Sequence, residues 1–209
     1  MSTTRHLVAL ASLAFAFGTG VSQELPAPQL AVGERWTYQT YDRQFDEGAF
    51  TIEVTEQTAN GYSLSATEVT AKVPSAIPSS LTLDLNWVQR AANGPEANCW
   101  FSFPLVVGQT WTCKTSWINQ YGHRGEDNIA WKVVGREQIS VKAGTFDTIK
   151  IVGEGRWKNN SIGNSDLSTI TVWFAPEARG LARYQRDNWP KNPGNPQRRL
   201  ELVRHVVAQ

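Results

Sequence analysis

The 209-residue sequence is poor in the residues that most often perform catalysis or bind metal ions. It contains three histidines and two cysteines. No histidine belongs to an H-x-H or H-E-x-x-H motif, so the sequence offers no recognisable metal site. The G-x-S-x-G motif of a large class of serine hydrolases is also absent. These absences predict no catalytic residue, no bound metal and no cofactor, and they make an enzyme the least favoured class of function.

The sequence also lacks an excess of charge of either sign. Twenty Lys and Arg residues face 19 Asp and Glu residues. Loss of Arg5 with an N-terminal leader would leave 19 against 19, a formal net charge of zero. A neutral, mixed-charge surface gives no electrostatic reason to expect nucleic acid or an anionic membrane as a partner.

The one long apolar run of the sequence lies at the N-terminus and has the form of a secretory signal peptide. Arg5 and His6 precede eleven apolar residues, 7–17, a run too short to span a bilayer. Gly20 and Ser22 are small residues at the positions that a signal peptidase requires. No cysteine follows the run, which argues against a lipid-modified N-terminus. An uncleaved anchor is the alternative interpretation.

These features predict a signal peptide at residues 1–22, cleaved near Ser22, and a single all-β domain at 23–209. The rest of the sequence has no uncharged apolar stretch long enough for a transmembrane helix. We therefore expect a periplasmic or secreted protein.

The two cysteines, Cys99 and Cys113, are expected to form a structural disulfide, because an even number of cysteines in an exported chain favours pairing. Such a bond closes a loop of 15 residues (99 to 113) and stabilises a fold by about 3 kcal/mol in the chain-entropy model. A redox or metal-binding role is the alternative. It lacks the C-x-x-C spacing and the nearby histidines of such sites.

A nine-residue phrase occurs twice in the sequence. The pattern V-G-x-x-W-T-x-x-T is found at 32–40 and again at 107–115, an offset of 75 residues. A glycine turn followed by an aromatic strand, used twice, predicts one sheet built from two similar halves, about 30–98 and 99–209.

Most of the chain alternates between apolar and polar residues with period two, which is typical of half-buried strands. Clear examples are 50–54 and the run Leu81, Leu83, Leu85 and Trp87, interpreted as one strand. No segment after residue 22 has a helical period with capping signals. The sequence therefore predicts an all-β fold, a large curved antiparallel sheet in the form of a half-barrel or open barrel.

The segments 141–151 (VKAGTFDTIKI) and 172–183 (VWFAPEARGLAR) resemble a family of bacterial secreted β-proteins of unknown function with a VxAGTF…WFAPxxG signature. Lys142 replaces a common proline of that signature, and Leu181 replaces a valine. The family is similar to the half-barrel fold of the lipoprotein-localisation factors, whose curved sheet presents an apolar concave face. The resemblance implies a fold and a compartment but no reaction. The carriers also have helices that plug their barrel, and this sequence predicts none.

Nine tryptophans are the main compositional excess of the chain. Tryptophan combines a large apolar surface with an N–H donor, so it suits both sugar-binding platforms and acyl-chain pockets. The alternative is that these side chains fill the core of the sheet. The tryptophans selected as candidate ligand-binding residues are Trp111, Trp117, Trp131, Trp157 and Trp173.

The most polar segment of the chain, Gly122–Asp127, is expected at a hairpin tip, with Glu126 and Asp127 adjacent in a loop. Such a loop places His123 beside carboxylates and could bind a ligand. More commonly it is a solvated hairpin end. His205 is expected to be an ordinary residue of the last strand.

These observations favour a non-enzymatic protein that binds an apolar or amphipathic ligand, such as a lipid or other apolar small molecule, on the curved sheet. Apolar residues on both faces of several strands leave more apolar surface than one core requires. The alternative is a module that binds an envelope glycan or another envelope protein through exposed tryptophans at hairpin tips.

Overall fold

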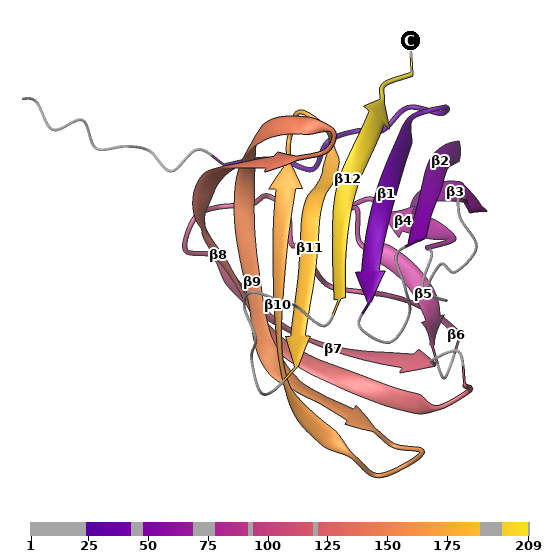
Figure 1. The fold of residues 1–209 in the computed structure, drawn as a ribbon, viewed down its shortest axis with the longest axis vertical. Coiled ribbons are helices and arrows are strands. Elements are labelled where there is room, and N and C mark those ends of the chain that lie inside the picture. Colours follow the sequence, from indigo (N-terminus) through magenta and orange to yellow (C-terminus); the bar gives the residue numbers. More distant parts are fainter. Residues whose placement is uncertain are drawn as a thin grey trace, which may run out of the picture.

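The computed structural model describes residues 24–42, 48–68, 78–91, 94–118, 121–188 and 198–208. The signal peptide expected at 1–22 lies outside the described residues. Within them the protein is all-β (Figure 1). Its strands are β1 (Arg35–Asp42), β2 (Gly48–Thr58), β3 (Gly61–Glu68), β4 (Ser80–Thr82), β5 (Trp87–Ala91), β6 (Gly94–Ala97), β7 (Thr110–Ile118), β8 (Arg124–Val141), β9 (Gly144–Asn159), β10 (Ser165–Ala175), β11 (Gly180–Asn188) and β12 (Arg198–Val206).

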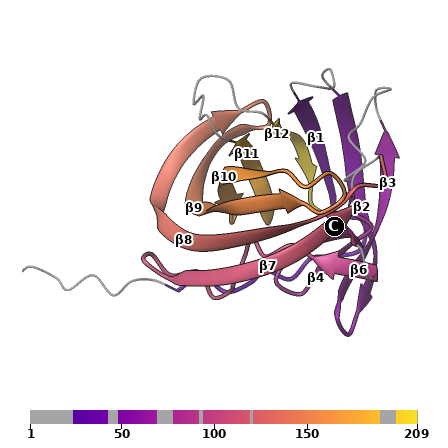
Figure 2. The ribbon, with the colours of Figure 1, turned by 90° about the horizontal axis from the view of Figure 1, so that it is seen from below.

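All the strands belong to one antiparallel sheet of order β6-β5-β4-β3-β2-β1-β12-β11-β10-β9-β8-β7. The first six and the last six strands each form a meander, and the two meanders meet where β1 pairs with β12. The sheet curls until its two edge strands, β6 and β7, lie side by side (Figures 1 and 2). The predicted fold class, a curved antiparallel sheet of two similar halves, is confirmed, and the curl brings it close to a closed barrel.

The two copies of the repeated phrase build the same turn before β1 and before β7. Gly33 has a φ of 89° and Gly108 a φ of 91°, values that favour glycine because it has no Cβ. The N–H of each glycine donates to the strand that pairs with the one it precedes. Gly33 donates to Val54 O of β2 at 2.7 Å, and Gly108 donates to Val133 O of β8 at 2.9 Å. The sequence repeat is therefore a structural repeat. The boundaries of the two halves stay a prediction.

Glycines on the inner face of β9 permit the strong curl of the second half. A Cβ on Gly153 would lie 2.6 Å from the Trp131 ring, and one on Gly155 would lie 2.0 Å from the backbone oxygen of Asn128. Both distances are shorter than non-bonded atoms tolerate. Side chains at these two positions would force β8 and β9 apart, so the glycines allow the sheet to fold tightly over its own concave face.

The concave face is covered at one end by an extended segment, residues 98–109, which connects β6 to β7. Asn86 holds this segment through its side chain, which donates to Phe101 O and accepts from Phe101 N, both at 2.9 Å. The Phe101 and Phe103 rings pack on Phe174 of β10, with centroids 5.4 Å away in both cases. The covering element is thus extended chain rather than a helix, and it supplies much of the aromatic core.

The run 81–87 was expected to form one strand, and this expectation is wrong. β4 ends at Thr82, a tight turn follows, and β5 begins at Trp87. Leu85 occupies the left-handed region with a φ of 57°, and Asn86 N donates to Thr82 Oγ1 at 3.1 Å. Leu85 is buried although it lies in the turn. An apolar residue therefore stands at every second position from 81 to 87, and the sequence pattern is the same as that of one continuous strand.

The polar segment expected as a hairpin loop is also different in the structure, because β8 starts at Arg124. Glu126 and Asp127 are consecutive strand residues and therefore point to opposite faces of the sheet. Glu126 pairs with Lys114 at 2.8 Å on the outside, and this hydrogen bond lowers the pKa of the Glu126 carboxyl. Asp127 points inward and is buried. Asp127 thus belongs to the interior of the barrel, although the polar residues around it in the sequence are typical of a loop.

A candidate ligand cavity in the barrel interior

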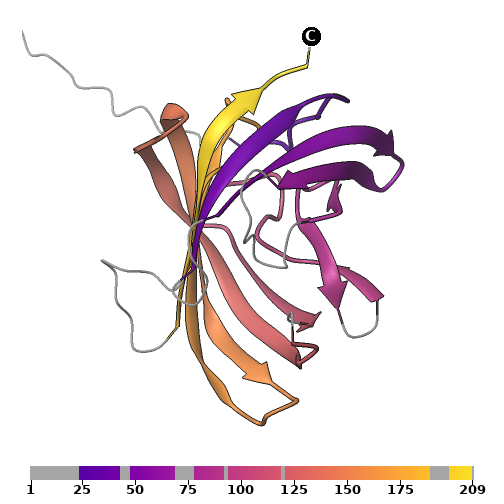
Figure 3. The ribbon, with the colours of Figure 1, turned by 45° about the vertical axis from the view of Figure 1, so that its right-hand side comes forward.

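The curled sheet encloses a cavity of about 110 Å³ that is partly open to solvent. Its lining residues come from both walls of the curled sheet, from β1, β2 and β5 on one side and from β7, β8, β10, β11 and β12 on the other. Figure 3 shows the backbone of these two walls. One part of its lining is apolar and mostly aromatic. These residues are Phe50, Trp87, Trp100, Ile129, Trp131, Ile170 and Leu200.

The aromatic side chains of the lining hold one another in place. The Trp100 ring lies 5.0 Å from that of Trp87 and 4.9 Å from that of Tyr184, measured between centroids. Trp131 stacks on Trp111 at 6.2 Å with an interplanar angle of 14°. Rings at these separations attract one another beyond their burial. The aromatic side chains of the apolar wall therefore support one another in the arrangement that the structure shows.

The other part of the lining is polar, and its centre is an ion pair across the concave face. Arg186 of β11 donates to both carboxylate oxygens of Asp127 of β8, at 3.0 and 3.2 Å. The two strands are separated in the sheet by β9 and β10. Because the side chains are only 22% and 12% exposed, this bidentate pair is stronger than a surface salt bridge.

Two further ionisable groups lie beside this pair. Arg198 of β12 is the direct register partner of Arg186, and Tyr184 lies two residues before Arg186 on the same face. Burial raises the pKa of Tyr184, although the two guanidinium groups oppose the change. Burial would lower the pKa of Arg186, but Asp127 and Tyr184 outweigh burial and raise it. The phenol is therefore neutral and the guanidinium charged at neutral pH.

Thr40 of β1 contributes an unsatisfied hydroxyl to the lining. Its side chain is 1% exposed, and its Oγ1 has no hydrogen-bond partner among the described residues. A buried polar group without a partner costs about 1–3 kcal/mol. A polar atom of a ligand or a water molecule in the cavity would remove this cost.

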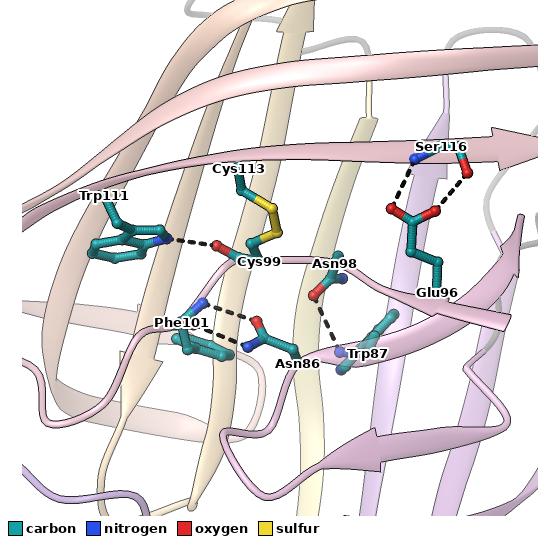
Figure 4. Close-up of a disulfide and its surroundings, with 9 residues drawn as sticks. All are labelled: Asn86, Trp87, Glu96, Asn98, Cys99, Phe101, Trp111, Cys113 and Ser116. Atoms are coloured by element: carbon teal, nitrogen blue, oxygen red, sulfur yellow. Dashed lines mark hydrogen bonds between the residues drawn. A yellow bond between two sulfur atoms is a disulfide. The ribbon is translucent and has the colours of Figure 1, made fainter.

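The seam between β6 and β7 borders the cavity and is closed by side chains (Figure 4). Cys99 and Cys113 are joined by a disulfide with a Cα–Cα distance of 6.2 Å, and both line the cavity. Trp111 Nε1 donates to Cys99 O at 2.9 Å. Farther along, Ser116 donates its backbone N–H and its hydroxyl to the Glu96 carboxylate. The disulfide thus fixes the segment that covers the concave face to β7.

The candidate tryptophans do not form one platform. Trp111, Trp117, Trp131 and Trp157 alternate along β7, β8 and β9 on the inner face, because their register partners place them there. Only Trp131 of the five lines the cavity. Trp111 lies behind it, and a Cβ on Gly125 would be only 2.0 Å from the Trp117 ring, so Trp117 packs on that glycine. As ligand contacts, these residues stay a prediction.

Trp173 lies on the outer face of β10, opposite its neighbours Val172 and Phe174. Lys150 and Arg183 lie over its ring, at 5.3 and 5.7 Å from the centroid, and its Nε1 donates to Glu137. Charged side chains therefore cover this tryptophan, which is 6% exposed.

Several lining residues could not be selected from the sequence. Trp87 and Trp100 belong to the same aromatic excess as the selected tryptophans, but Trp100 lies in a segment without a strand pattern. Asp127 and Arg186 come together only because the sheet curls across β9 and β10, the two strands that separate β8 from β11. The adjacency of Trp100 to Cys99 is the one local signal that this segment faces the interior.

Of the histidines in the described residues, neither His123 nor His205 lines the cavity. His205 Nε2 lies 2.9 Å from Glu34 Oε1, and its ring stacks on Trp36. Glu34 is fully buried and also pairs with Arg179 at 2.9 Å. In the part of the chain that the structure describes, no three His, Cys, Asp or Glu side chains are grouped as a metal site would need.

Two solved structures have this fold. A candidate exported protein with a YmcC-like fold from Bacteroides fragilis NCTC 9343 matches with a TM-score of 0.51 and 15% identity, over 89% of this chain and 100% of that chain. A candidate lipoprotein from Parabacteroides distasonis ATCC 8503 matches with a TM-score of 0.50 and 14% identity, over 87% of this chain and 97% of that chain. At these identities the likeness concerns the fold alone.

No protein-family model and no curated protein sequence matches the chain. Among the described residues there is no helix with the length and apolar character that a membrane crossing needs.

Proposed function

We propose that this protein is an exported, non-enzymatic component of the bacterial cell envelope that holds a small apolar or amphipathic molecule inside its curled sheet. The observation that carries the proposal is the cavity of about 110 Å³ with an aromatic wall on one side and a polar wall on the other. Ligand sites typically combine a mostly apolar surface with a few fixed polar groups.

The volume of the cavity limits what it encloses. An engineered cavity of about 150 Å³ takes up benzene, so this cavity accommodates a group of about one ring. Pockets that enclose whole drug-sized ligands measure about 300–1,000 Å³. A longer molecule, such as a lipid, would therefore place one end in the cavity and extend the rest through the open side.

The polar wall favours binding over catalysis. None of the described lining residues is a histidine, and Asp127 is held by Arg186 rather than by a hydroxyl that it could activate. A nucleophile needs a base within hydrogen-bond distance.

Three features together support an exported location. The N-terminal sequence has the form of a signal peptide, the two cysteines form a disulfide, and the fold occurs in a candidate exported protein and in a candidate lipoprotein. Disulfides persist in oxidising compartments such as the periplasm.

The test uses the mature chain, residues 23–209, purified from the periplasm. Mass spectrometry of an organic extract is expected to find a co-purifying small molecule, and 1-anilinonaphthalene-8-sulfonate is expected to bind and be displaced by it. The control variant Ile170→Trp fills the cavity and is expected to lose the dye signal while keeping its circular dichroism spectrum. Equal dye binding by both proteins, with nothing in the extract, would remove the proposal.

A further inference from the structure

One side chain of the cavity lining carries a hydrogen-bonding group that the fold leaves unused. Thr40 of β1 lines the cavity and is 1% exposed. Of the described lining residues, it is the one with a buried side-chain polar atom that has no hydrogen-bond partner. Buried polar groups in proteins are nearly always paired, so this hydroxyl needs an explanation. A partner inside the cavity provides one.

The neighbours of Thr40 in the sheet cannot supply this partner. Its register partners are Leu200 of β12 and Gly48 of β2, and neither has a polar side-chain atom. Thr37 lies on the outer face of the same strand, and its hydroxyl lies 2.9 Å from that of its own partner in β2, Thr51. The sheet thus satisfies the outward threonine and leaves the hydroxyl of the inward one to the cavity.

The aromatic wall of the cavity begins beside this hydroxyl. Phe50 is two residues after Gly48 on β2, so it is a diagonal neighbour of Thr40 on the inner face. The Phe50 and Trp87 rings meet edge to face with centroids 6.3 Å apart, and both line the cavity. A ring held against these two side chains therefore has the Thr40 hydroxyl next to it.

The charged side chains of the lining already have contacts of their own. Arg186 binds both oxygens of Asp127, and Arg198 also takes part in an interaction. A charged ligand group would have to compete with these contacts and would also lose its hydration. An uncharged group loses less hydration, and the Thr40 hydroxyl can donate to it or accept from it.

We propose that the cavity binds an uncharged molecule with a ring-sized apolar part and a hydrogen-bonding substituent such as a hydroxyl, and that Thr40 Oγ1 bonds this substituent. This inference rests on the proposed function and names the class of its ligand. An apolar molecule of the same size leaves the buried hydroxyl unpaired, so the site selects against it. A water molecule on Thr40 in the free protein does not reverse this selection, because a ligand hydroxyl reproduces the hydrogen bond of the water.

The experiment compares phenol with toluene on the mature chain, residues 23–209. The two probes have the same size and differ by a hydroxyl in place of a methyl group. Isothermal titration calorimetry measures both affinities, and the NMR shift of the Thr40 methyl group shows where the ring binds. Phenol is expected to bind at least as tightly as toluene, although its transfer out of water is less favourable.

Two matched variants of β1 assign the effect to Thr40, since each replaces a hydroxyl by a methyl group. Thr40→Val is expected to lower the ratio of phenol to toluene affinity about tenfold, the effect of one buried hydrogen bond. Thr37→Val changes the outer face of the same strand and is expected to leave the ratio unchanged. Without ligand, Thr40→Val should unfold at no lower temperature than the parent, because its hydroxyl has no partner in the fold.

Two charged probes test whether the ligand is uncharged. Benzoate and benzylammonium have nearly the same size as phenol, and both are expected to bind more weakly than phenol. Tighter binding of either one would overturn the inference.

The inference and the proposed function fail in different ways. A phenol-to-toluene ratio that is the same in the parent and in Thr40→Val would overturn the inference and leave the proposed function standing. A clearly lower unfolding temperature of Thr40→Val would also overturn it, because the hydroxyl would then have a structural partner. Absence of binding for all four probes would instead remove the proposed function as well.

Discussion

The two halves of the sheet meet at two junctions, and different kinds of contact join them. At one junction β1 and β12 form a backbone ladder from Arg35↔Val206 to Asp42↔Arg198. At the other, β6 and β7 are joined by the disulfide, by Trp111 and by the Glu96–Ser116 contacts. The same sequence phrase begins β1 and β7, so the difference arises in their neighbours rather than in these strands.

The neighbour of β7 cannot provide a long ladder. β6 has four residues, against nine in β12, and one of the four is Pro95, which has no N–H to donate. A short edge strand that contains proline leaves most of β7 without a backbone partner in β6. Side-chain contacts and a covalent bond take the place of the ladder, and the cavity lies directly behind this junction.

A second difference between the halves concerns one position of the repeated turn. Glu34 and Gln109 occupy the same place, and each side chain accepts from the backbone N–H three residues earlier. Glu34 then pairs with Arg179 and His205, whereas the Gln109 amide donates to Ser102 O at 2.8 Å. The charged side chain thus binds the turn between β10 and β11 and the end of β12, whereas the neutral side chain binds the covering segment.

The largest effect is expected from the junction that lacks a ladder. The double substitution Cys99→Ala with Cys113→Ala is predicted to lower the free energy of unfolding by about 3 kcal/mol, because a loop of 15 residues is no longer closed. Urea titration followed by fluorescence measures the loss. Leu202→Ala is the control. It should lower the free energy of unfolding by a similar amount through lost core packing at the β1–β12 junction. Because it keeps the disulfide, its stability should fall further on reduction with dithiothreitol, whereas that of the double variant should not change. A double variant as stable as the parent would show that the disulfide does not hold the seam.

The second-largest effect is expected at Glu34, the charged side chain of the first turn, and it should exceed the effect at its neutral counterpart Gln109. Glu34→Ala removes a fully buried carboxylate and leaves Arg179 and His205 without their partner, so it is predicted to cost about 2–3 kcal/mol. Gln109→Ala loses neutral hydrogen bonds and should cost about 1 kcal/mol. Thermal unfolding of the two variants measures the difference. Equal losses would mean that the ion pairs add nothing to the turn.

The glycines of the two turns are expected to behave alike. Gly33→Ala and Gly108→Ala each force a Cβ into the left-handed region, at a cost of about 1–2 kcal/mol. Space is not limiting at either site, since the nearest atom to a Cβ at Gly33 is 3.6 Å away and nothing lies within 4 Å at Gly108. Chemical denaturation should give matching losses. A clear mismatch would contradict the structural equivalence of the repeat.

The smallest effect is expected from Glu96, which accepts from Ser116 across the seam. Glu96→Ala should cost about 1 kcal/mol, because the pair is only partly buried. Glu96→Gln keeps an acceptor, so its loss of stability should be about half that of Glu96→Ala. A loss as large as that of the disulfide variant would mean that this contact is the main closure of the seam.

The sequence predicted the features that depend on local pattern. The turn before Trp36 and Trp111 follows from a glycine at a fixed place, and the strand at 50–54 follows from its alternation. Cys99 and Cys113 could be paired because no other cysteine was present.

The features that the sequence did not predict depend on contacts between distant residues or on ambiguous composition. The hairpin at 82–86 keeps an apolar alternation through its turn, so period two could not separate β4 from β5. Asp127 lies in a polar run typical of a loop, yet it is a strand residue whose partner, Arg186, is 59 residues away. The cavity itself depends on the curl of the whole sheet, which no local pattern encodes.

Residue-resolved hydrogen–deuterium exchange by NMR tests the difference between the two junctions most directly. Alternate amides of β7, those of Thr112 and Lys114, share the direction of Ser116 N and face the seam. They are predicted to exchange at least about tenfold faster than the β1 amides that face β12, and to speed up further on reduction of the disulfide. Equal protection at both junctions, unchanged by reduction, would mean that a backbone ladder closes the seam and would contradict the account.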